Sequence, residues 1–203
     1  MTDPERGPSA RHEELLERAY RYALAHGLAD LSLRPLATAI ESSPRVLLFL
    51  FGSKEGLVRA LLARARTDEL ALLDQARQDG ACGDLATVMR TTWRWLAAEA
   101  HRPLLTLWAE AYTRSLVEPD GSWANFARQT VNDWLAVLAT AQPPRHRNTK
   151  RGTTERTLAL AVLRGALLDL LATGDVARTS AAVDQHLLHN IRPSDGLTNL
   201  AAS

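Results

Sequence analysis

Apolar residues recur every three or four positions along most of the chain, which is the spacing of amphipathic α-helices. The first such segment runs from Arg11 to a glycine stop at Gly27. Two short helices are then expected at residues 33–39 and 44–49, followed by a long helix at residues 53–79. The same spacing predicts five more helices, at residues 84–100, 103–117, 123–140, 154–172 and 177–190.

No segment of the chain predicts a strand convincingly. The run Val46–Phe51 has local β-propensity, but proline, glycine and serine flank it and its neighbours are helical. The sequence therefore predicts an all-α fold of about nine helices.

Three segments lack this periodicity and are expected to be loose. Residues 1–10 contain two prolines and read as a flexible N-terminal tail, and residues 193–203 read as a loose C-terminal tail. Residues 142–152, with the sequence QPPRHRNTKRG, carry two prolines and several basic side chains. We interpret them as a solvated, disordered connector between two long helices.

Composition places the protein among ordinary soluble chains. It has 203 residues, of which 46% are hydrophobic and 23% charged, enough to bury a core in one or two domains. No apolar run exceeds six residues, whereas a membrane-spanning helix needs about 20. No signal peptide is visible, and the single cysteine, Cys82, excludes an internal disulfide. We expect a cytoplasmic protein with no membrane partner.

Charge and motifs argue against several other classes. The formal net charge of +1 does not by itself indicate a polyanionic partner. The chain has no glycine-rich phosphate loop, no recognisable Ser/His/Asp arrangement and no acid-rich metal motif. We therefore expect no enzyme activity, no catalytic residue, no metal site and no cofactor.

The first sixty residues carry the most specific pattern. Three short helices precede a longer helical body, a common arrangement for a helix-turn-helix head. The stretch Leu31–Ala39 reads LSLRPLATA, and Ser43–Leu57 reads SPRVLLFLFGSKEGL. These segments resemble the N-terminal domain of the TetR family of bacterial transcriptional regulators. Phe51–Leu57 matches that family's F-x-S-K-E-x-L element in full.

The resemblance implies the organisation and activity of the chain. Residues 11–52 would form a helix-turn-helix DNA-binding domain, and residues 53–192 a helical effector-binding and dimerisation domain. The implied function is that of a homodimeric regulator that binds a double-stranded DNA operator. A repressor released from a palindromic operator by a small apolar or aromatic effector is the form we expect.

Two departures from the family pattern leave an alternative open. Glu41-Ser42 stands where the family usually has Gly-Val, and Leu48-Phe49-Leu50 replaces its usual tyrosine and histidine. Tyrosine and histidine at those places usually contact phosphates. The alternative is a TetR-like helical dimer that has lost specific DNA binding and acts through ligand or partner binding.

A recognition helix must bury one face on its domain and place the other in the major groove. Val46, Leu47 and Leu50 are expected on the buried face. Arg45 suits guanine or a phosphate, and Phe49 suits a thymine methyl group. The predicted DNA-binding residues are Arg34, Ser43, Pro44, Arg45, Leu48, Phe49, Ser53 and Lys54.

All five tryptophans lie between residues 93 and 134. Such clusters often line cavities, because the indole N–H needs a polar partner. The resemblance implies an effector pocket in these helices, and the alternative is a plain aromatic core. The expected pocket residues are Trp93, Trp108, Tyr112, Phe126 and Trp134.

The segment Leu158–Ala172 is apolar almost all round, apart from Arg164 and Asp169. A helix without a polar face must be covered on more than one side, and a second subunit is the simplest cover. The resemblance implies that this helix and the last one pair with their twofold mates as a four-helix bundle. The expected interface residues are Leu158, Ala161, Val162, Gly165, Val183 and Leu187.

Overall fold

The computed structural model describes residues 8–28, 30–79 and 84–190. Within these ranges the chain forms ten α-helices and one short 3₁₀ turn, and no strand. The all-α fold class is therefore confirmed. None of the helices in the described ranges has the length and apolarity needed to cross a bilayer.

The helices divide into two compact units, which interleave along the sequence. The first unit comprises Met1–Leu70 and Arg102–Thr130, and the second comprises Ala71–His101 and Val131–Ser203. Both α4 and α7 contribute residues to each unit.

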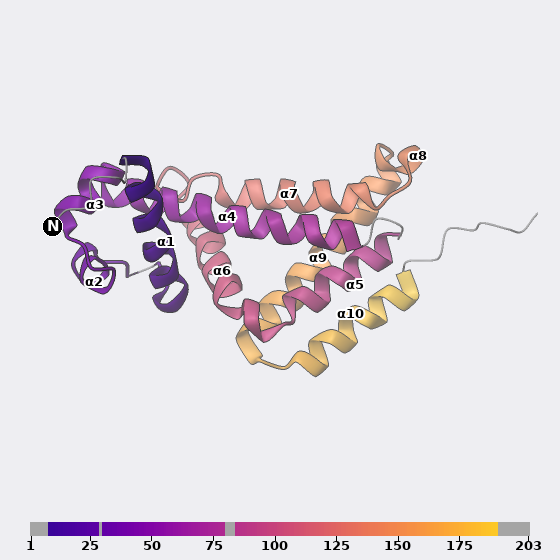
Figure 1. Ribbon diagram of the computed structural model, residues 1–203. Coiled ribbons are helices and arrows are strands. Elements are labelled where there is room, and N and C mark those ends of the chain that lie inside the picture. The colour runs from indigo at the N-terminus through magenta and orange to yellow at the C-terminus, as the bar shows by residue number, and fades with distance from the viewer. Residues whose placement is uncertain (1–7, 29, 80–83, 191–203) are drawn as a thin grey trace, which may run out of the picture. The chain divides into compact units, whose positions relative to one another are not determined.

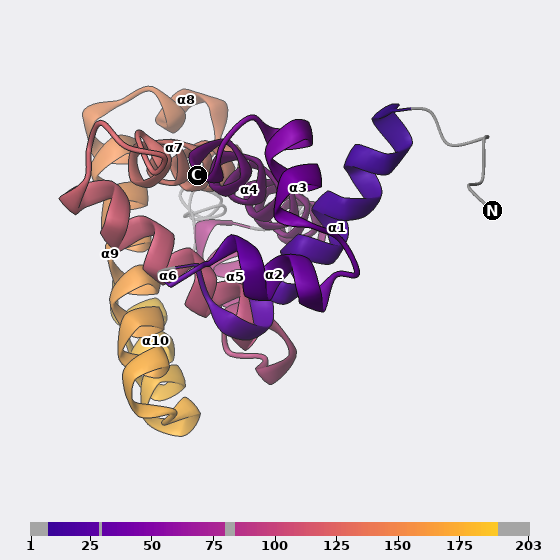
Figure 2. The ribbon, with the colours of Figure 1, turned by 90° about the vertical axis from the view of Figure 1, so that its left-hand side faces the viewer.

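The first unit contains the head of the chain (Figures 1 and 2). Its elements are α1 (Pro8–His26), α2 (Leu33–Ala39), α3 (Pro44–Phe51), the first part of α4 (Lys54–Asp79), α6 (Arg102–Val117) and the start of α7 (Phe126–Thr140). α1 packs against α2 and α6, and α2 packs against α3. The core leucines are Leu15, Leu36, Leu47, Leu57 and Leu61, each no more than 1% exposed.

Local capping explains where the short helices begin and end. Ser43 caps α3, where its side chain accepts a hydrogen bond from Val46 N at 3.3 Å. Gly52, with φ of +78°, ends α3, and Ser53 Oγ accepts from Gly56 N at 3.0 Å in the first turn of α4. Ser32 occupies the cap position of α2, but its side chain makes no capping bond.

Gly56 is required by a close backbone approach that the sequence motif does not reveal. A Cβ atom at this position would overlap the carbonyl oxygen of Phe51. The tight passage from α3 into α4 therefore depends on the absence of a side chain at residue 56.

The second unit is a helical layer in which α10 packs against both α9 and α5, and α5 also packs against α9 (Figure 1). Besides parts of α4 and α7, it contains α5 (Leu85–Leu96), the 3₁₀ turn η1 (Glu99–His101), α8 (Pro144–Arg147), α9 (Lys150–Thr173) and α10 (Val176–Asn190). Its most deeply buried side chains include Met89, Leu96, Leu138, Leu163 and Leu167.

The predicted disordered connector at residues 142–152 is wrong. The segment instead contains α8 and the beginning of α9. Gln142 is 4% exposed, and its Nε2 donates to the Gly152 carbonyl at 2.8 Å. Arg156 donates to the Arg147 carbonyl at 2.6 Å and to Gln142 Oε1 at 3.2 Å. These hydrogen bonds, made by Gln142 within the segment and by Arg156 just after it, order a segment whose composition alone predicts disorder.

Several other boundaries differ from the sequence expectation by a few residues. α1 begins at Pro8 rather than Arg11, and α7 begins at Phe126 after a turn. The predicted helix at residues 84–100 ends at Leu96 and is followed by η1. Residues 1–7, Cys82 and the predicted tail at 193–203 lie outside the described residues.

Candidate nucleic-acid interface

The α3 helix presents three side chains of the predicted reading surface to solvent. Phe49 is 85% exposed, Leu48 is 42% exposed, and Arg45 is also exposed. Their spacing of three and four residues places them on one face of the helix. An almost fully exposed phenylalanine on an ordered helix is unusual in a soluble protein and marks a candidate contact surface.

The opposite face of α3 is held to the domain mainly by Leu47, which is 1% exposed. Leu50, three residues later on the same side of the helix, is half-buried. Val46 was expected on the buried face but is 37% exposed, because the covered face of this short helix is only about one side chain wide.

Two helix beginnings flank this surface. The oxygens of Ser43 and Ser53 already accept capping bonds, so at these positions the serines order the backbone. Lys54 and Glu55 are exposed in the first turn of α4. The pKa of Glu55 is lowered, chiefly by its own backbone N–H and then by Ser53. Glu55 stays ionised at this helix end, and its negative charge would repel a phosphate. Lys54 is therefore the group there that suits a phosphate.

The remaining predicted contacts lie at the edge of the same domain. Arg34 is exposed in the first turn of α2, and Pro44 is half-buried at the first position of α3. Both positions belong to helices that pack together.

A polar cluster that the sequence analysis missed joins α1 to α4. Arg64 forms ion pairs with Glu17 and Asp68, and its Cζ lies 4.9 Å from the centre of the Tyr20 ring. The Tyr20 hydroxyl donates to Asp68 Oδ2 at 2.9 Å. Burial first, and then Asp68, raise the pKa of Tyr20. The i,i+4 spacing of Arg64 and Asp68 is visible in the sequence, but the contacts that join them to Glu17 and Tyr20 link distant parts of the chain, and no spacing rule could have found those.

The turn between α2 and α3 contains a strained residue. Glu41 has φ of +55°, a left-handed conformation that L-residues other than asparagine rarely adopt. Arg18 Nη1 reaches this turn, donating to the Ile40 carbonyl at 3.3 Å and to Glu41 Oε2 at 3.5 Å. Glu41 is also one of the residues at which this sequence departs from the pattern of the family that it resembles.

A second anchor joins α6 to the end of α1. Glu110 Oε2 accepts a hydrogen bond from Leu28 N at 2.9 Å. Gly27, with φ of +79°, lets the chain leave α1 beside this carboxylate, and a Cβ there would lie 3.2 Å from Glu110 Oε2.

The five expected effector-pocket residues do not fall in one unit. Trp108, Tyr112 and Phe126 belong to the first unit, where the rings of Trp108 and Tyr112 lie 5.1 Å apart. Trp93 and Trp134 belong to the second. All are buried except Tyr112, which is half-buried.

The expected interface residues divide into an exposed and a buried set. Leu158 is 48% exposed, Ala161 and Gly165 are exposed, and Val162 is half-buried. Val183 and Leu187, by contrast, are 1% and 3% exposed. Both lie in the core of the chain itself, on a helix that packs against α5 and α9. The expectation that they face a partner therefore needs this correction.

Known structures share this architecture, although no protein-family model and no curated protein sequence matches the chain. The multidrug binding protein EbrR in complex with imidazole is 23% identical, with a TM-score of 0.65, and the match covers 95% of this chain and 93% of EbrR. A transcriptional regulator from Rhodococcus sp. is 22% identical with a TM-score of 0.68, covering 87% of this chain and 93% of that protein.

A TetR transcription regulator from Haloarcula marismortui has the same arrangement of helices. It is 16% identical, with a TM-score of 0.63 over 87% of this chain and 94% of its own. These similarities establish the fold, an all-α architecture with an N-terminal helix-turn-helix head, and confirm the fold that the sequence resemblance implied.

Proposed function

We propose that this chain, which has the fold of TetR-family transcriptional regulators, is a homodimeric repressor that leaves a palindromic operator when a small effector binds. Residues 11–52 would contact DNA, and residues 53–192 would hold the effector and the second subunit. It would act on double-stranded DNA in the cytoplasm, without catalysis.

The observation that carries the DNA-binding proposal is the exposed face of α3. Arg45, Leu48 and Phe49 share that face, on a helix anchored from behind by Leu47. A guanidinium beside two apolar side chains suits a major groove that offers guanine acceptors next to thymine methyl groups. We therefore expect the operator half-site to contain a guanine close to a thymine.

Binding to genomic fragments, followed by sequencing of the bound DNA, tests the proposal and supplies the operator. Arg45→Ala should cost about 1–3 kcal/mol and relax the preference at one base position. Phe49→Ala should relax the preference for thymine at a neighbouring position. Lys54→Ala should weaken all sequences about equally and reduce the salt dependence of binding.

Arg128→Ala is the matched control, because it removes one exposed arginine of the first unit on α7. It should leave operator affinity unchanged. If the purified dimer shows no sequence preference at moderate salt, the regulator proposal fails. That result favours a helical dimer that has lost specific DNA binding and acts through a ligand or a protein partner.

The assembly proposal rests on the surface of α9. The helix buries Leu160, Leu163, Leu167 and Leu170 within the protomer, and it exposes a second apolar stripe. The stripe consists of Leu158, Ala161, Gly165, Leu168 and Ala172. Its spacings of three, four, three and four residues are those of a helix that packs along a partner helix. An identical helix of a second subunit fits such a seam, with Gly165 allowing close approach.

Gly165→Glu separates assembly from folding. A Cβ at Gly165 meets no atom within 4 Å in the protomer, so the glutamate fits the isolated chain. It would place an uncompensated charge inside a dimer seam. We expect a folded monomer that has lost operator binding. Thr153→Glu, exposed on α9 but off the stripe, is the control and should remain dimeric.

Analytical ultracentrifugation and operator binding measure these outcomes. A Gly165→Glu protein that stays dimeric would contradict the proposed seam. A monodisperse wild-type monomer that binds a full operator tightly would contradict the assembly proposal altogether. The two reading helices of a dimer must reach half-sites about 34–36 Å apart.

The effector proposal rests on the concentration of aromatic side chains in the body of the chain. Trp108, Tyr112 and Phe126 offer mostly buried ring surface in the first unit, as Trp93 and Trp134 do in the second. Such surface suits a largely apolar or flat aromatic ligand. EbrR, of similar fold, has been solved with imidazole and with proflavin, which supports aromatic compounds as the first candidates.

Tryptophan fluorescence quenching by such compounds tests the effector proposal. Binding should lower operator affinity by the same factor by which operator DNA lowers effector affinity, because the two equilibria are linked. A compound that binds without changing operator affinity would not be the effector. Quenching that persists when Trp93, Trp108 and Trp134 are all replaced by phenylalanine would place the ligand elsewhere.

A further inference from the structure

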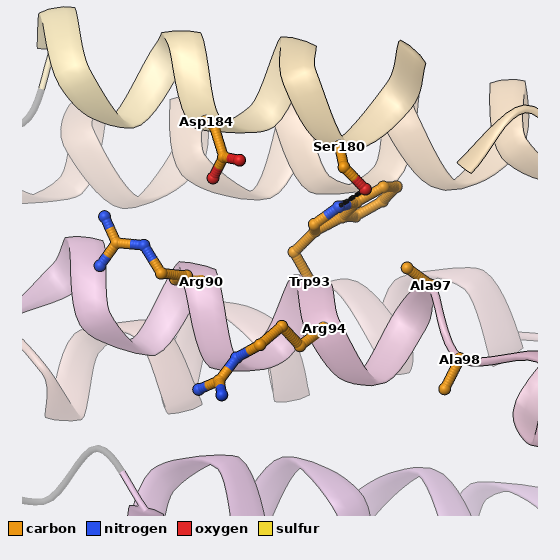
Figure 3. Close-up of a pocket in the computed structure, with 7 residues that line it drawn as sticks. All are labelled: Arg90, Trp93, Arg94, Ala97, Ala98, Ser180 and Asp184. Atoms are coloured by element: carbon orange, nitrogen blue, oxygen red, sulfur yellow. Dashed lines mark hydrogen bonds between the residues drawn. The ribbon is translucent and has the colours of Figure 1, made fainter. Parts of the chain in front are cut away.

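The second unit has a pocket of ≈ 340 Å³ between α5 and α10. This volume is near the lower end of the range for small-molecule sites, about 300–1,000 Å³. Charged groups stand at one end of the pocket and small apolar side chains at the other (Figure 3). The pocket lining includes Arg90, Trp93, Ala97, Ala98, Ser180 and Asp184.

Trp93 fixes the middle of the pocket. It is 4% exposed, and its Nε1 donates to Ser180 Oγ at 3.0 Å, which ties α5 to α10 (Figure 3). Since the serine oxygen acts as the acceptor here, its own proton stays available to a ligand.

Arg90 on α5 and Asp184 on α10 form the charged end. Both side chains extend into the space between the two helices (Figure 3). Both residues are exposed, and neither has an ion pair or hydrogen bond to any other residue in the described part of the chain. Because these two groups do not pair, the Arg90 guanidinium can bind an anionic group of a ligand and the Asp184 carboxylate can bind a cationic group.

Ala97 and Ala98 line the other end. Arg94 does not compete with Arg90 for an anion there, because its guanidinium turns away from α10 and its Nη2 donates to Thr91 Oγ1 at 3.1 Å (Figure 3). Its alkyl chain remains as a wall. An apolar group of a few carbon atoms is what this end can cover.

We propose that this pocket binds an α-amino acid with an apolar side chain. The carboxylate pairs with the Arg90 guanidinium, the ammonium pairs with the Asp184 carboxylate, and the side chain lies along Trp93 toward Ala97 and Ala98. Adjacent opposite charges at one end and an apolar group at the other are the features of a zwitterionic amino acid. The site is built within one unit and does not depend on the proposed DNA binding.

Calorimetric titration with L-leucine tests the proposal, and two analogues dissect it. Isocaproate keeps the carboxylate and the branched chain but lacks the ammonium, and L-leucinamide keeps the ammonium but lacks the carboxylate. We expect L-leucine to bind about tenfold more tightly than either analogue, since each analogue loses one charge-assisted pair. In protein labelled at tryptophan nitrogen, the Trp93 indole signal should shift most among the five.

Variants then assign each half of the ligand. Arg90→Gln should weaken L-leucine about tenfold and leave L-leucinamide unchanged. Asp184→Asn should weaken L-leucine about tenfold and leave isocaproate unchanged. Arg151→Gln removes an exposed arginine of α9 outside the pocket and should behave as wild type. Circular dichroism confirms that each variant is folded.

Three results would overturn the proposal. The first is no saturable L-leucine binding below about 10 mM. The second is equal binding of L-leucine and both analogues, which would mean that Arg90 and Asp184 pair with each other in solution. The third is wild-type L-leucine affinity in folded Arg90→Gln and Asp184→Asn proteins.

Discussion

Replacing Glu41 by glycine should stabilise the protein, although it removes a side-chain interaction. Glu41 occupies the turn between α2 and α3 with φ of +55°. A left-handed conformation costs an ordinary L-residue about 1–2 kcal/mol, and glycine adopts it without that cost. Against this, glycine adds freedom to the unfolded chain, worth about 0.4–1 kcal/mol.

The side chain that is lost contributes little. Glu41 Oε2 lies 3.5 Å from Arg18 Nη1, and its side chain is 86% exposed, so solvent screens the pair. The backbone bonds of the turn do not depend on it, because Ser42 N donates to the Ala37 carbonyl at 2.8 Å. Glu41→Ala removes the same ion pair but keeps a Cβ and is therefore the correct reference.

We expect the free energy of unfolding of Glu41→Gly to exceed that of Glu41→Ala by about 0.5–1 kcal/mol. For a chain of this size the midpoint temperature should rise by about 1–4 °C. Urea and thermal unfolding, followed by circular dichroism, measure both. Asn125, the other non-glycine residue with positive φ (+65°) in the described chain, should gain less from glycine because asparagine tolerates this conformation.

A Glu41→Gly protein that is no more stable than Glu41→Ala would refute the reasoning. It would mean that the backbone at residue 41 relaxes in solution to a conformation without positive φ. Operator binding by Glu41→Gly should match wild type, since the turn keeps its backbone hydrogen bonds.

Three further predictions concern packing and pH. Gly56→Ala should destabilise the head by about 3 kcal/mol or more, because the new Cβ would overlap the Phe51 carbonyl oxygen; chemical denaturation measures the loss, and a near-neutral effect would contradict the close approach. Leu163→Ala, at a side chain that is fully buried in the second unit, should cost about 2–5 kcal/mol in the same assay, and a smaller loss would show that the site collapses. Tyr20→Phe should remove a loss of stability at alkaline pH. Because the pKa of Tyr20 is raised in the folded state, only the unfolded state loses this proton above about pH 10. Wild-type stability therefore falls as pH rises beyond that point, and the variant lacks this contribution. Urea titrations of both proteins at neutral and alkaline pH measure the difference, and parallel pH profiles would contradict it.

Most of the helical layout could be predicted from the sequence because its signals are local. The bounds of α2 match the expected residues 33–39, and α4 was placed correctly from residues 53–79. Serines, prolines and glycines at the ends of the head helices act on the backbone within a few residues. Phe51–Leu57 likewise identified the α3–α4 junction from its order of residues alone. Helix period, caps and a contiguous motif can thus all be recognised in the sequence without tertiary information.

Which side of each helix is covered was decided only by tertiary structure. Leu158 and Val183 have similar apolar character, yet one is 48% exposed and the other 1%. An apolar side chain prefers to be buried, but the residues that cover it come from a distant part of the chain. At residues 142–152 the deciding contacts are nearer in sequence: specific side-chain hydrogen bonds of Gln142 and Arg156 order a polar segment whose composition alone predicts a loose connector.

The candidate sites show the same division. The exposure of Arg45, Leu48 and Phe49 on α3 could be predicted because these residues are neighbours in sequence, although Val46 was expected to be buried and is not. The Arg64 cluster, the requirement for glycine at residue 56 and the placement of Arg90 and Asp184 in one pocket could not. Each depends on distances between atoms of separate elements or of closely passing backbone. A sequence fixes such distances only through the packing of the whole domain, because no local rule relates the two sides of the contact.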